Sequence, residues 1–386
     1  MRLVGGTVYA LSIPFVESFA HSRAARTGCD SVVVRVEDEV GTEGFGEGAP
    51  RPYVTGETVS GMVEHLAGDL WPAVAERELP PLTGERDLYV LDARIPHSDV
   101  PGLVSDSASR AALELAIVDC LLRRQRQSLG AILRPRRPRV AYSGVIPAGP
   151  LDRALRHARQ MKLIGLRQIK VKVGGDDDVA RVRQIREVLG PEVSLRVDAN
   201  GAWTLPRAVE VLRALAPFAI AAVEQPLPRG PVGDLRRLRD ESPVPIMVDE
   251  SLVTLADAEA LIAARAADFF NVRVSKQGGL ARSLEIARWA REVGIQVQIG
   301  SQVGETAILS AAGRHLAAAL DEVAFVEGSY GSLLLTEDVS VDPVRFGYGG
   351  VAPILTGPGL GVRVLPERLQ KYAERVIALA PTGVRV

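Results

Sequence analysis

Residues 168–175 read QIKVKVGG and place two lysines, Lys170 and Lys172, at alternate positions of an otherwise apolar strand. Side chains alternate between the two faces of a strand, so both lysines point to the same side. A cation on a buried face is costly unless it has partners. The alternative is an edge strand whose lysines extend to solvent. The surrounding sequence decides between the two interpretations.

Short apolar runs that end in a polar residue recur after this strand at nearly constant spacing. The closing residues lie 24 to 26 positions apart, and they are Lys172, Asp198, Glu224, Asp249, Arg273 and Gln298. A repeat of this length, one strand plus one helix, indicates βα units. SGVI at 143–146 and FVEGS at 325–329 flank the series and bring the strands to eight. We therefore predict an α/β fold with a closed parallel barrel. An open doubly wound sheet is the alternative, although no GxGxxG motif opens a helix after the first strand.

The first 100 or so residues have a different pattern. Strand-like runs at 5–13 and 31–37 alternate with turn-forming segments and one helical pattern at 58–74, which indicates an α+β unit. We expect the first run to be an edge strand. A long apolar helix is predicted at 105–125, with serine and aspartate available to cap its start.

Composition excludes several classes of function. Lys and Arg (46) nearly balance Asp and Glu (47), so no basic face for nucleic acid is expected. The two cysteines form neither a CxxC motif nor a zinc-ligand spacing, which favours a reducing, cytoplasmic location. Charged residues interrupt every apolar stretch before about 18 residues, so no membrane span is predicted.

Three carboxylates close neighbouring strands of the predicted barrel. The carboxyl ends of barrel strands form one mouth, where active sites of such barrels lie. Asp198, Glu224 and Asp249 would therefore repel one another there unless a cation neutralises them. Oxygen ligands without His or Cys select a hard metal ion, and we predict Mg²⁺. Each carboxylate alone could instead cap the following helix.

The lysines of the opening stretch fit the same site. In a barrel, Lys170 and Lys172 point into the interior, one strand away from Asp198. A lysine that lies near a second cation and is partly desolvated has its ammonium form disfavoured, so it can act as a base near neutral pH.

Five motifs in this order resemble the enolase superfamily, in its muconate lactonizing enzyme subgroup. They are KVKV, RVDANGAW, VEQPL, VDES and NVRVSKQGG. The resemblance implies an α+β capping domain at 1–130, a modified TIM barrel, (β/α)7β, at 131–340, and a segment at 341–386 that returns to the capping domain. It also implies Mg²⁺ ligation by Asp198, Glu224 and Asp249, and an acid/base role for Lys172. Lys170 would lie beside Lys172 and lower its pKa or touch the substrate, and Asn200 would lie near the metal ion.

The chemistry implied by this resemblance is removal of the proton α to a substrate carboxylate, which gives a metal-stabilised enediolate. Elimination, cycloisomerisation or epimerisation of a small carboxylic acid could follow. A barrel that has lost catalysis and only binds a ligand is the alternative from another class. By resemblance alone we also expect a symmetric homo-oligomer.

One position departs from the subgroup. Its members usually place the opposing acid/base lysine at the end of the sixth strand, where this chain has Arg273. Lys276 matches a second family lysine, and Asn271 supports that alignment. An arginine stays charged and is a poor proton carrier, which favours a one-base elimination or cycloisomerisation over racemisation or epimerisation. Arg273 would clamp an anion, or it could be a structural arginine paired with Asp249 or Glu250.

Substrate contacts are expected from the capping domain and the last two strands. Two loops, near residues 20 and 53, are candidate lids, although both could be ordinary surface turns. The candidate contacts are Arg23, Tyr53, Gln298, Ser301, Gln302 and Glu327.

Overall fold

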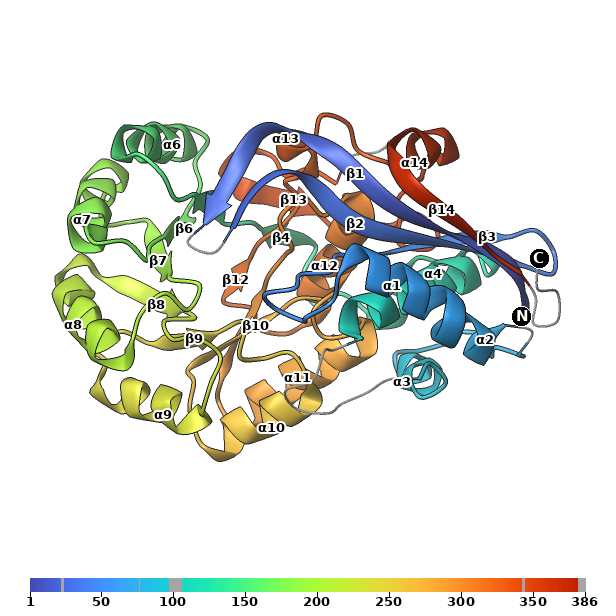
Figure 1. The fold of residues 1–386 in the computed structure, drawn as a ribbon, viewed down its shortest axis with the longest axis horizontal. Coiled ribbons are helices and arrows are strands. Elements are labelled where there is room, and N and C mark those ends of the chain that lie inside the picture. Colours follow the sequence, from blue (N-terminus) through green and yellow to red (C-terminus); the bar gives the residue numbers. More distant parts are fainter. Residues whose placement is uncertain (22–23, 76, 97–105, 342–343, 381–386) are drawn as a thin grey trace.

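The structure is a computed structural model of the chain and describes residues 1–21, 24–75, 77–96, 106–341 and 344–380. A curled eight-stranded parallel sheet forms one part, and a four-stranded antiparallel sheet with its helices lies beside it (Figure 1). In the part of the chain that the structure describes, no helix is both long and apolar enough to cross a membrane. Cys29 and Cys120 are buried and form no disulfide.

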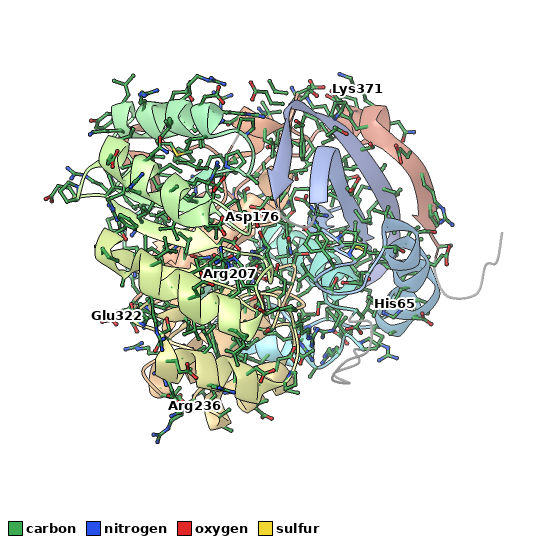
Figure 2. All side chains as sticks on the ribbon, turned by 60° about the vertical axis from the view of Figure 1, so that its left-hand side comes forward. His65, Asp176, Arg207, Arg236, Glu322 and Lys371 are labelled. Atoms are coloured by element: carbon green, nitrogen blue, oxygen red, sulfur yellow. The ribbon has the colours of Figure 1, made fainter. Side chains whose placement is uncertain are left out.

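The parallel sheet follows the predicted alternation of strands and helices. Its strands are β5 (Gly144–Ile146), β6 (Gln168–Lys172), β7 (Ser194–Asp198), β8 (Ile220–Glu224), β9 (Ile246–Val248), β10 (Phe269–Val272), β11 (Gln296–Ile299) and β12 (Phe325–Val326). The connecting helices are α6 (Leu151–Leu163), α7 (Asp178–Leu189), α8 (Leu205–Leu215), α9 (Val232–Glu241), α10 (Leu255–Ala263), α11 (Leu280–Glu292) and α12 (Ala307–Ala319), and a short 3₁₀ turn, η2 (Ala216–Phe218), follows α8. Figure 2 shows charged side chains such as Arg236 on α9 pointing outward.

Strand order separates the two predicted architectures. The strands are neighbours in chain order from β5 to β12. A doubly wound sheet reverses its order at a switch point, so that alternative is wrong. The sheet curls until the Ser143 N–H, just before β5, donates to the Val326 carbonyl of β12 at 2.8 Å.

Strand register brings the predicted site residues together. Lys172 lies opposite Asp198 in the β6–β7 pair, and Asp198 lies opposite Glu224 in the β7–β8 pair. Ile169 and Val171 alternate with the lysines and belong to the hydrophobic core. The lysines are therefore on an inner face, and the alternative of a solvent-facing edge strand is wrong.

The antiparallel sheet has the order β14 (Ala373–Leu379), β1 (Leu3–His21), β2 (Ala24–Asp38) and β3 (Glu43–Gly48). The C-terminal segment thus returns to the N-terminal sheet. The expectation that the first run is an edge strand is wrong, because β14 pairs with β1 on the side away from β2. Pro14, which lacks an N–H, lies where the β1–β2 register shifts. The exact boundaries at residues 130 and 340 stay a prediction.

Helices of 4 to 18 residues cover this sheet and join it to the barrel. They are α1 (Val59–His65), the π-helical turn η1 (Leu66–Leu70), α2 (Trp71–Val74), α3 (Arg86–Asp92), α4 (Ser107–Arg124) and α5 (Leu129–Leu133). The C-terminal region adds α13 (Gly331–Leu334), η3 (Tyr348–Gly350), β13 (Val351–Pro353), which pairs with β4 (Arg139–Ala141), and α14 (Pro366–Tyr372). The predicted helix at 105–125 is α4, and the pattern at 58–74 is divided among α1, η1 and α2.

Two buried carboxylates fix the N-terminal part onto barrel helices. Glu114 of α4 accepts hydrogen bonds from the Leu280 and Ala281 amides at the start of α11. Glu47 of β3 accepts from the Thr306 amide at the start of α12. Free N–H groups at a helix start attract negative charge, so these contacts hold the two parts in one orientation.

The close packing of α4 on β3 leads to a prediction about the stability of the protein. A Cβ at Gly46 would overlap the Ala112 carbonyl and the Ala116 amide of α4, and backbone atoms cannot move aside cheaply. We expect Gly46→Ala to lower the free energy of unfolding by about 3 kcal/mol in urea denaturation. The control is Gly68→Ala, where a Cβ meets nothing within 4 Å, and its stability should be unchanged or slightly higher. Equal stability of the two variants would contradict this packing.

Candidate active site

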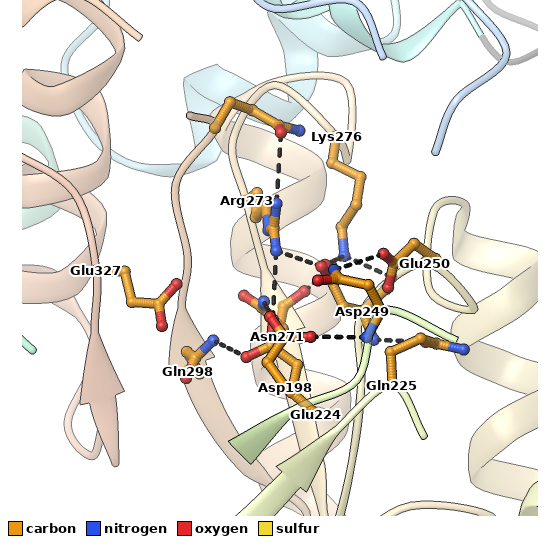
Figure 3. Close-up of polar contacts among 12 residues, drawn as sticks. Asp198, Glu224, Gln225, Asp249, Glu250, Asn271, Arg273, Lys276, Gln298 and Glu327 are labelled. Carbon is orange, nitrogen blue, oxygen red and sulfur yellow. Dashed lines mark hydrogen bonds and ion pairs between the residues drawn. The ribbon is translucent and has the colours of Figure 1, made fainter. Parts of the chain in front are cut away.

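A cavity of about 430 Å³ opens at the carboxyl ends of the parallel strands. Its polar end is lined by Lys170, Lys172, Asn200, Asp249, Glu250 and Arg273. The capping part contributes Tyr53 and residues 16–18 of β1. Asp198 and Glu224 do not line the cavity but lie fully buried beneath this end. Figure 3 shows the two carboxylates below Arg273 and beside Asp249.

Lys172 lies at the cavity wall and is held by two oxygen acceptors. Its Nζ donates to Asp198 Oδ2 at 2.6 Å and to Asn200 Oδ1 at 2.8 Å. Asn200 in turn donates through Nδ2 to Glu250 Oε1 at 3.0 Å. These contacts fix the direction of the amine toward the cavity floor.

Lys170 lies between three carboxylates. Its Nζ is 2.9 Å from Glu327 Oε2, 3.1 Å from Glu224 Oε2 and 3.2 Å from Asp198 Oδ2. Burial by itself lowers the pKa of Lys170, but the three negative charges outweigh it and raise that pKa above its usual value. Lys170 is thus a fixed positive charge. The prediction that it lowers the pKa of Lys172 stays a prediction.

The predicted ligands have opposed electrostatic environments. Burial favours the neutral form of Asp198, but Lys172 and Lys170 outweigh it and hold its pKa below the usual range. Burial, followed by the charge of Asp198, raises the pKa of Glu224 to about 7. Burial likewise favours neutral Asp249, yet Arg273 and Lys276 lower its pKa. The buried negative charge therefore depends on the surrounding cations.

Arg273 follows β10 and contacts two of the predicted ligands. Its guanidinium donates to Asp249 Oδ2, and its Nη2 lies 3.3 Å from Glu224 Oε1. Its Nη1 is 3.4 Å from Gln302 Oε1. The pairing with Asp249 is one that the sequence alone suggested, and the contact with Glu224 was not expected. The group also lines the cavity, so it can face a substrate.

Lys276 is completely buried and does not line the cavity. Its Nζ donates to the carbonyl and Oδ1 of Asp249, both at 2.7 Å, and to the Asn271 carbonyl at 2.8 Å. These contacts hold Asp249 in place. Arg273, and not Lys276, is therefore the basic residue that this loop presents to the cavity.

The polar groups around the predicted ligands are oxygens and nitrogens of buried side chains. Among the described residues, no three His, Cys, Asp or Glu side chains lie together closely enough to hold a metal ion as they stand. Five buried carboxylates (Asp198, Glu224, Asp249, Glu250 and Glu327) are instead matched by five buried cations (Lys170, Lys172, Arg196, Arg273 and Lys276). In the part of the chain that the structure describes, three buried side-chain oxygens have no hydrogen-bond partner, and they are Glu250 Oε2, Asn271 Oδ1 and Gln298 Oε1.

These features fit a hard cation by donor type. The carboxylate and amide oxygens are ligands that Mg²⁺ prefers, and an unpartnered buried oxygen is costly without a cation or water. Arg273 now contacts oxygens of Glu224 and Asp249, so its guanidinium and a metal ion would compete for them.

The remaining predicted residues divide into two groups. Tyr53, Ser301, Gln302 and Glu327 line the cavity, as does Asn200. Gln298 and Asn271 lie beneath it and donate to Glu224 at 3.1 and 3.0 Å, so neither side chain reaches the cavity. Gln298 thus does not lie where a substrate contact was expected, because its side chain points to the barrel interior. Arg23 lies outside the described residues.

Several residues of the site were not anticipated. The Gln225 Oε1 atom accepts hydrogen bonds from the Asp249 and Ser251 amides, at 3.0 and 3.1 Å, and these contacts fix the loop after β9. Glu305 lines the cavity and accepts the Gln302 amide at 2.9 Å, and burial raises its pKa to about 8. The adjacency of Gln225 to Glu224 was the available sequence signal. Glu305 has no such signal because it follows no strand directly.

Asp178 is a third unanticipated residue. It is the first residue of α7, yet it is buried and accepts hydrogen bonds from the Gly174 amide at 2.9 Å and from Trp203 Nε1 at 3.3 Å. It therefore ties the loop after β6 to the loop after β7, next to Lys172 and Asp198.

Known proteins share this fold and length. Residues 153–368 match the family described as enolase C-terminal domain-like. The chain is 31% identical to hydrophobic dipeptide epimerase of Enterococcus faecalis over 83% of this chain and 88% of that protein. It is 28% identical to muconate cycloisomerase 1 of Rhodococcus opacus over 96% and 98%.

A solved structure extends the comparison. Dipeptide epimerase from Cytophaga hutchinsonii, in complex with Mg and the dipeptide D-Ala-L-Val, superposes with a TM-score of 0.87 at 26% identity, covering 98% of this chain and all of that one. The similarity includes both the barrel and the capping part. The relatives are enzymes, which sets aside the alternative of a non-catalytic binding protein. The chain is therefore an enzyme of the enolase superfamily, with muconate cycloisomerases and epimerases among its relatives.

Proposed function

We propose that the protein removes the proton α to the carboxylate of a small organic acid, with Lys172 as its one base. The observation that carries this proposal is the pair of basic groups at the cavity: Lys172 at the end of β6 and Arg273 directly after β10. A lysine amine can exchange a proton with a substrate, whereas a guanidinium stays charged.

Asp198, Glu224 and Asp249 would hold Mg²⁺, which would polarise the substrate carboxylate and so acidify its α-carbon. The site residues carry the rest of the reaction. Lys172 takes the α-proton, and the electron pair moves into the carboxylate to form an enediolate. Lys170 and Arg273 place fixed positive charge beside this dianion. Because these groups already point inward, little reorganisation is needed as the charge develops.

Charge balance supports this assignment. The five buried carboxylates and five buried cations are equal in number, and burial favours the neutral form of a sixth carboxyl group, Glu305, so a divalent ion leaves an excess of positive charge at the cavity floor. A monoanionic substrate compensates part of this excess, and a dianionic enediolate compensates more. The site is thus better matched to the intermediate than to the substrate, which is the condition for catalysis.

The fate of the intermediate follows from Arg273. Because Arg273 carries no proton to the intermediate, we favour loss of a β-substituent from the enediolate. Where that substituent stays part of the same molecule, its loss opens a ring, and the overall reaction is a cycloisomerisation. Racemisation or epimerisation is the second candidate, since relatives such as the Enterococcus faecalis enzyme carry that activity in their names. It requires a proton donor on the face opposite Lys172.

Proton exchange in deuterated water tests the proposal. The purified enzyme is incubated with Mg²⁺ and a panel of chiral carboxylates, and the α-proton signal and optical rotation are followed by NMR and polarimetry. We expect α-proton exchange with retention, and with one panel member elimination or ring opening. Exchange with inversion would favour the second candidate. No exchange with any member would remove the support for both.

Exchanging Arg273 for lysine is expected to change the stereochemical outcome. Arg273→Lys places an amine that can carry a proton on the wall after β10, so solvent deuterium should enter on both faces and the substrate should racemise. Arg273→Gln introduces an amide, which does not transfer a proton to carbon, so this variant should show exchange with retention only. If both variants behave alike, position 273 does not control the face of protonation.

A further inference from the structure

Part of the cavity lining is apolar, unlike the charged floor. This part consists of Val145 of β5, which lies opposite Lys170 of β6, Met161 and Ile164 at the end of α6, Leu333 and Leu334 of α13, and Phe346. We call these six residues the apolar chamber. It is continuous with the space above Lys172 and Arg273, because both sets of residues line one cavity.

The side of the chamber that Phe346 forms is held rigidly by aromatic contacts. The Phe346 ring stacks on Tyr142 with centroids 5.6 Å apart and meets Tyr330 edge-on at 5.5 Å. Tyr330 is anchored through its hydroxyl to the Ser143 carbonyl at 2.7 Å. A preformed aromatic surface of this kind favours a rigid or branched apolar group over water.

Apolar side chains also stay exposed where the chamber meets solvent. Leu333 is 64% exposed and Ile164 is 43% exposed, and Val16 of β1 lies at the same cavity with 63% exposure. Exposed apolar groups that converge on one cavity indicate a binding surface rather than scattered surface residues.

The charged groups near the chamber are already compensated. Arg153 of α6 pairs with Glu17 of β1 at 2.8 Å. Burial lowers the pKa of His157, which favours its neutral form. Apart from Lys170, Lys172 and Arg273 of the floor, these two are the basic residues among the described cavity lining, so a second substrate carboxylate would have to compete with Glu17 for Arg153.

From these observations we infer that the substrate is a monocarboxylate with a bulky apolar group, which the apolar chamber binds while the carboxylate lies at the charged floor. This inference rests on the proposed function for the position of the carboxylate. It excludes a substrate with a second carboxylate at its distal end.

Binding of straight-chain carboxylates tests the inference without requiring turnover. Propionate through decanoate are titrated into the enzyme with saturating Mg²⁺ by calorimetry. Each methylene that enters the chamber should tighten binding by up to about fourfold, until the chamber is filled. Nonanedioate should bind at least tenfold more weakly than nonanoate. Affinity that is independent of chain length, or tighter binding of nonanedioate, would overturn the inference.

A matched pair of leucines locates the effect. Leu333→Arg should weaken octanoate binding at least tenfold and leave propionate unchanged. Leu163→Arg, on α6 but 80% exposed and outside the cavity lining, should change neither. If Leu333→Arg proves unstable in thermal unfolding, the comparison of nonanoate with nonanedioate on the unmodified enzyme still decides.

The outcomes separate this inference from the proposed function. A chain-length gradient without α-proton exchange in any carboxylate would support the chamber and contradict the catalytic proposal. α-Proton exchange with short carboxylates, without a dependence of affinity on chain length, would support the catalytic proposal and contradict the apolar chamber.

Discussion

Replacing Lys172 by methionine is expected to lower the rate of α-proton exchange by about 10³-fold, because it removes the proposed base. Methionine keeps the length of the side chain and avoids a large hole. The substitution leaves Asp198 without its 2.6 Å partner, although Lys170 still lies 3.2 Å from it. We therefore expect the protein to stay folded, with a measurable loss of stability.

A conservative variant separates proton transfer from charge. Lys172→Arg keeps a cation beside Asp198 but cannot act as a base near neutral pH. Exchange should be lost in this variant as fully as in Lys172→Met, while Mg²⁺ and carboxylate binding stay closer to the unmodified enzyme. Exchange retained in Lys172→Arg would mean that the lysine acts only through its charge.

A distant lysine provides the control. Lys371 lies on the outside of α14 (Figure 2) and pairs with Glu337, with 60% of its side chain exposed. Lys371→Met should leave exchange unchanged and cost little stability, since exposed ion pairs contribute little. Thermal unfolding of all three variants shows whether a loss of exchange reflects chemistry or unfolding.

The barrel could be predicted because its repeating units all have to span the same distances. Each strand must cross the sheet and each helix must return along it, so the closing residues recur at nearly one spacing. That spacing placed Lys172, Asp198 and Glu224 side by side, and the register bears this out. The position of these carboxylates and lysines next to one another therefore follows directly from the repeat.

Other features depend on contacts that no local pattern encodes. β1 reads as an edge strand until β14, more than 350 residues later, supplies its second partner. Gln298 was expected to close a strand like its neighbours, but β11 continues to Ile299 and the Gln298 side chain turns inward to Glu224. The apolar chamber combines α6, α13 and Phe346, which share no repeat. Tertiary packing decides such positions, and a single sequence carries little signal for it.

Two substitutions in one charge cluster are expected to shift Mg²⁺ affinity in opposite directions. Glu224→Gln removes a buried anion and a predicted ligand while keeping its shape. We expect Mg²⁺ binding, measured by calorimetry without substrate, to weaken by at least about 100-fold. The loss should also leave Lys170 with two carboxylates instead of three.

Arg273→Met removes a cation from the same oxygens. Asp249 and Glu224 then lose a positive neighbour, and a unit charge at about 4 Å is worth roughly 4 kcal/mol at an effective dielectric of about 20. The metal-free protein should be less stable, because two buried carboxylates lose their partner. Mg²⁺ should relieve this cost, so we expect at least about tenfold tighter binding and a larger rise in melting temperature on adding Mg²⁺.

The opposite signs make this pair a strict test of where the ion binds. General damage to the barrel would weaken binding in both variants, and a metal site elsewhere would leave both unchanged. Only an ion that shares the oxygens of Glu224 and Asp249 gains from loss of the arginine and suffers from loss of the glutamate. If Arg273→Met weakens Mg²⁺ binding, the guanidinium does not compete with the ion. Mg²⁺ binding would then depend on Arg273 keeping Asp249 and Glu224 in position, and the two cations would lie side by side instead of sharing the same oxygens.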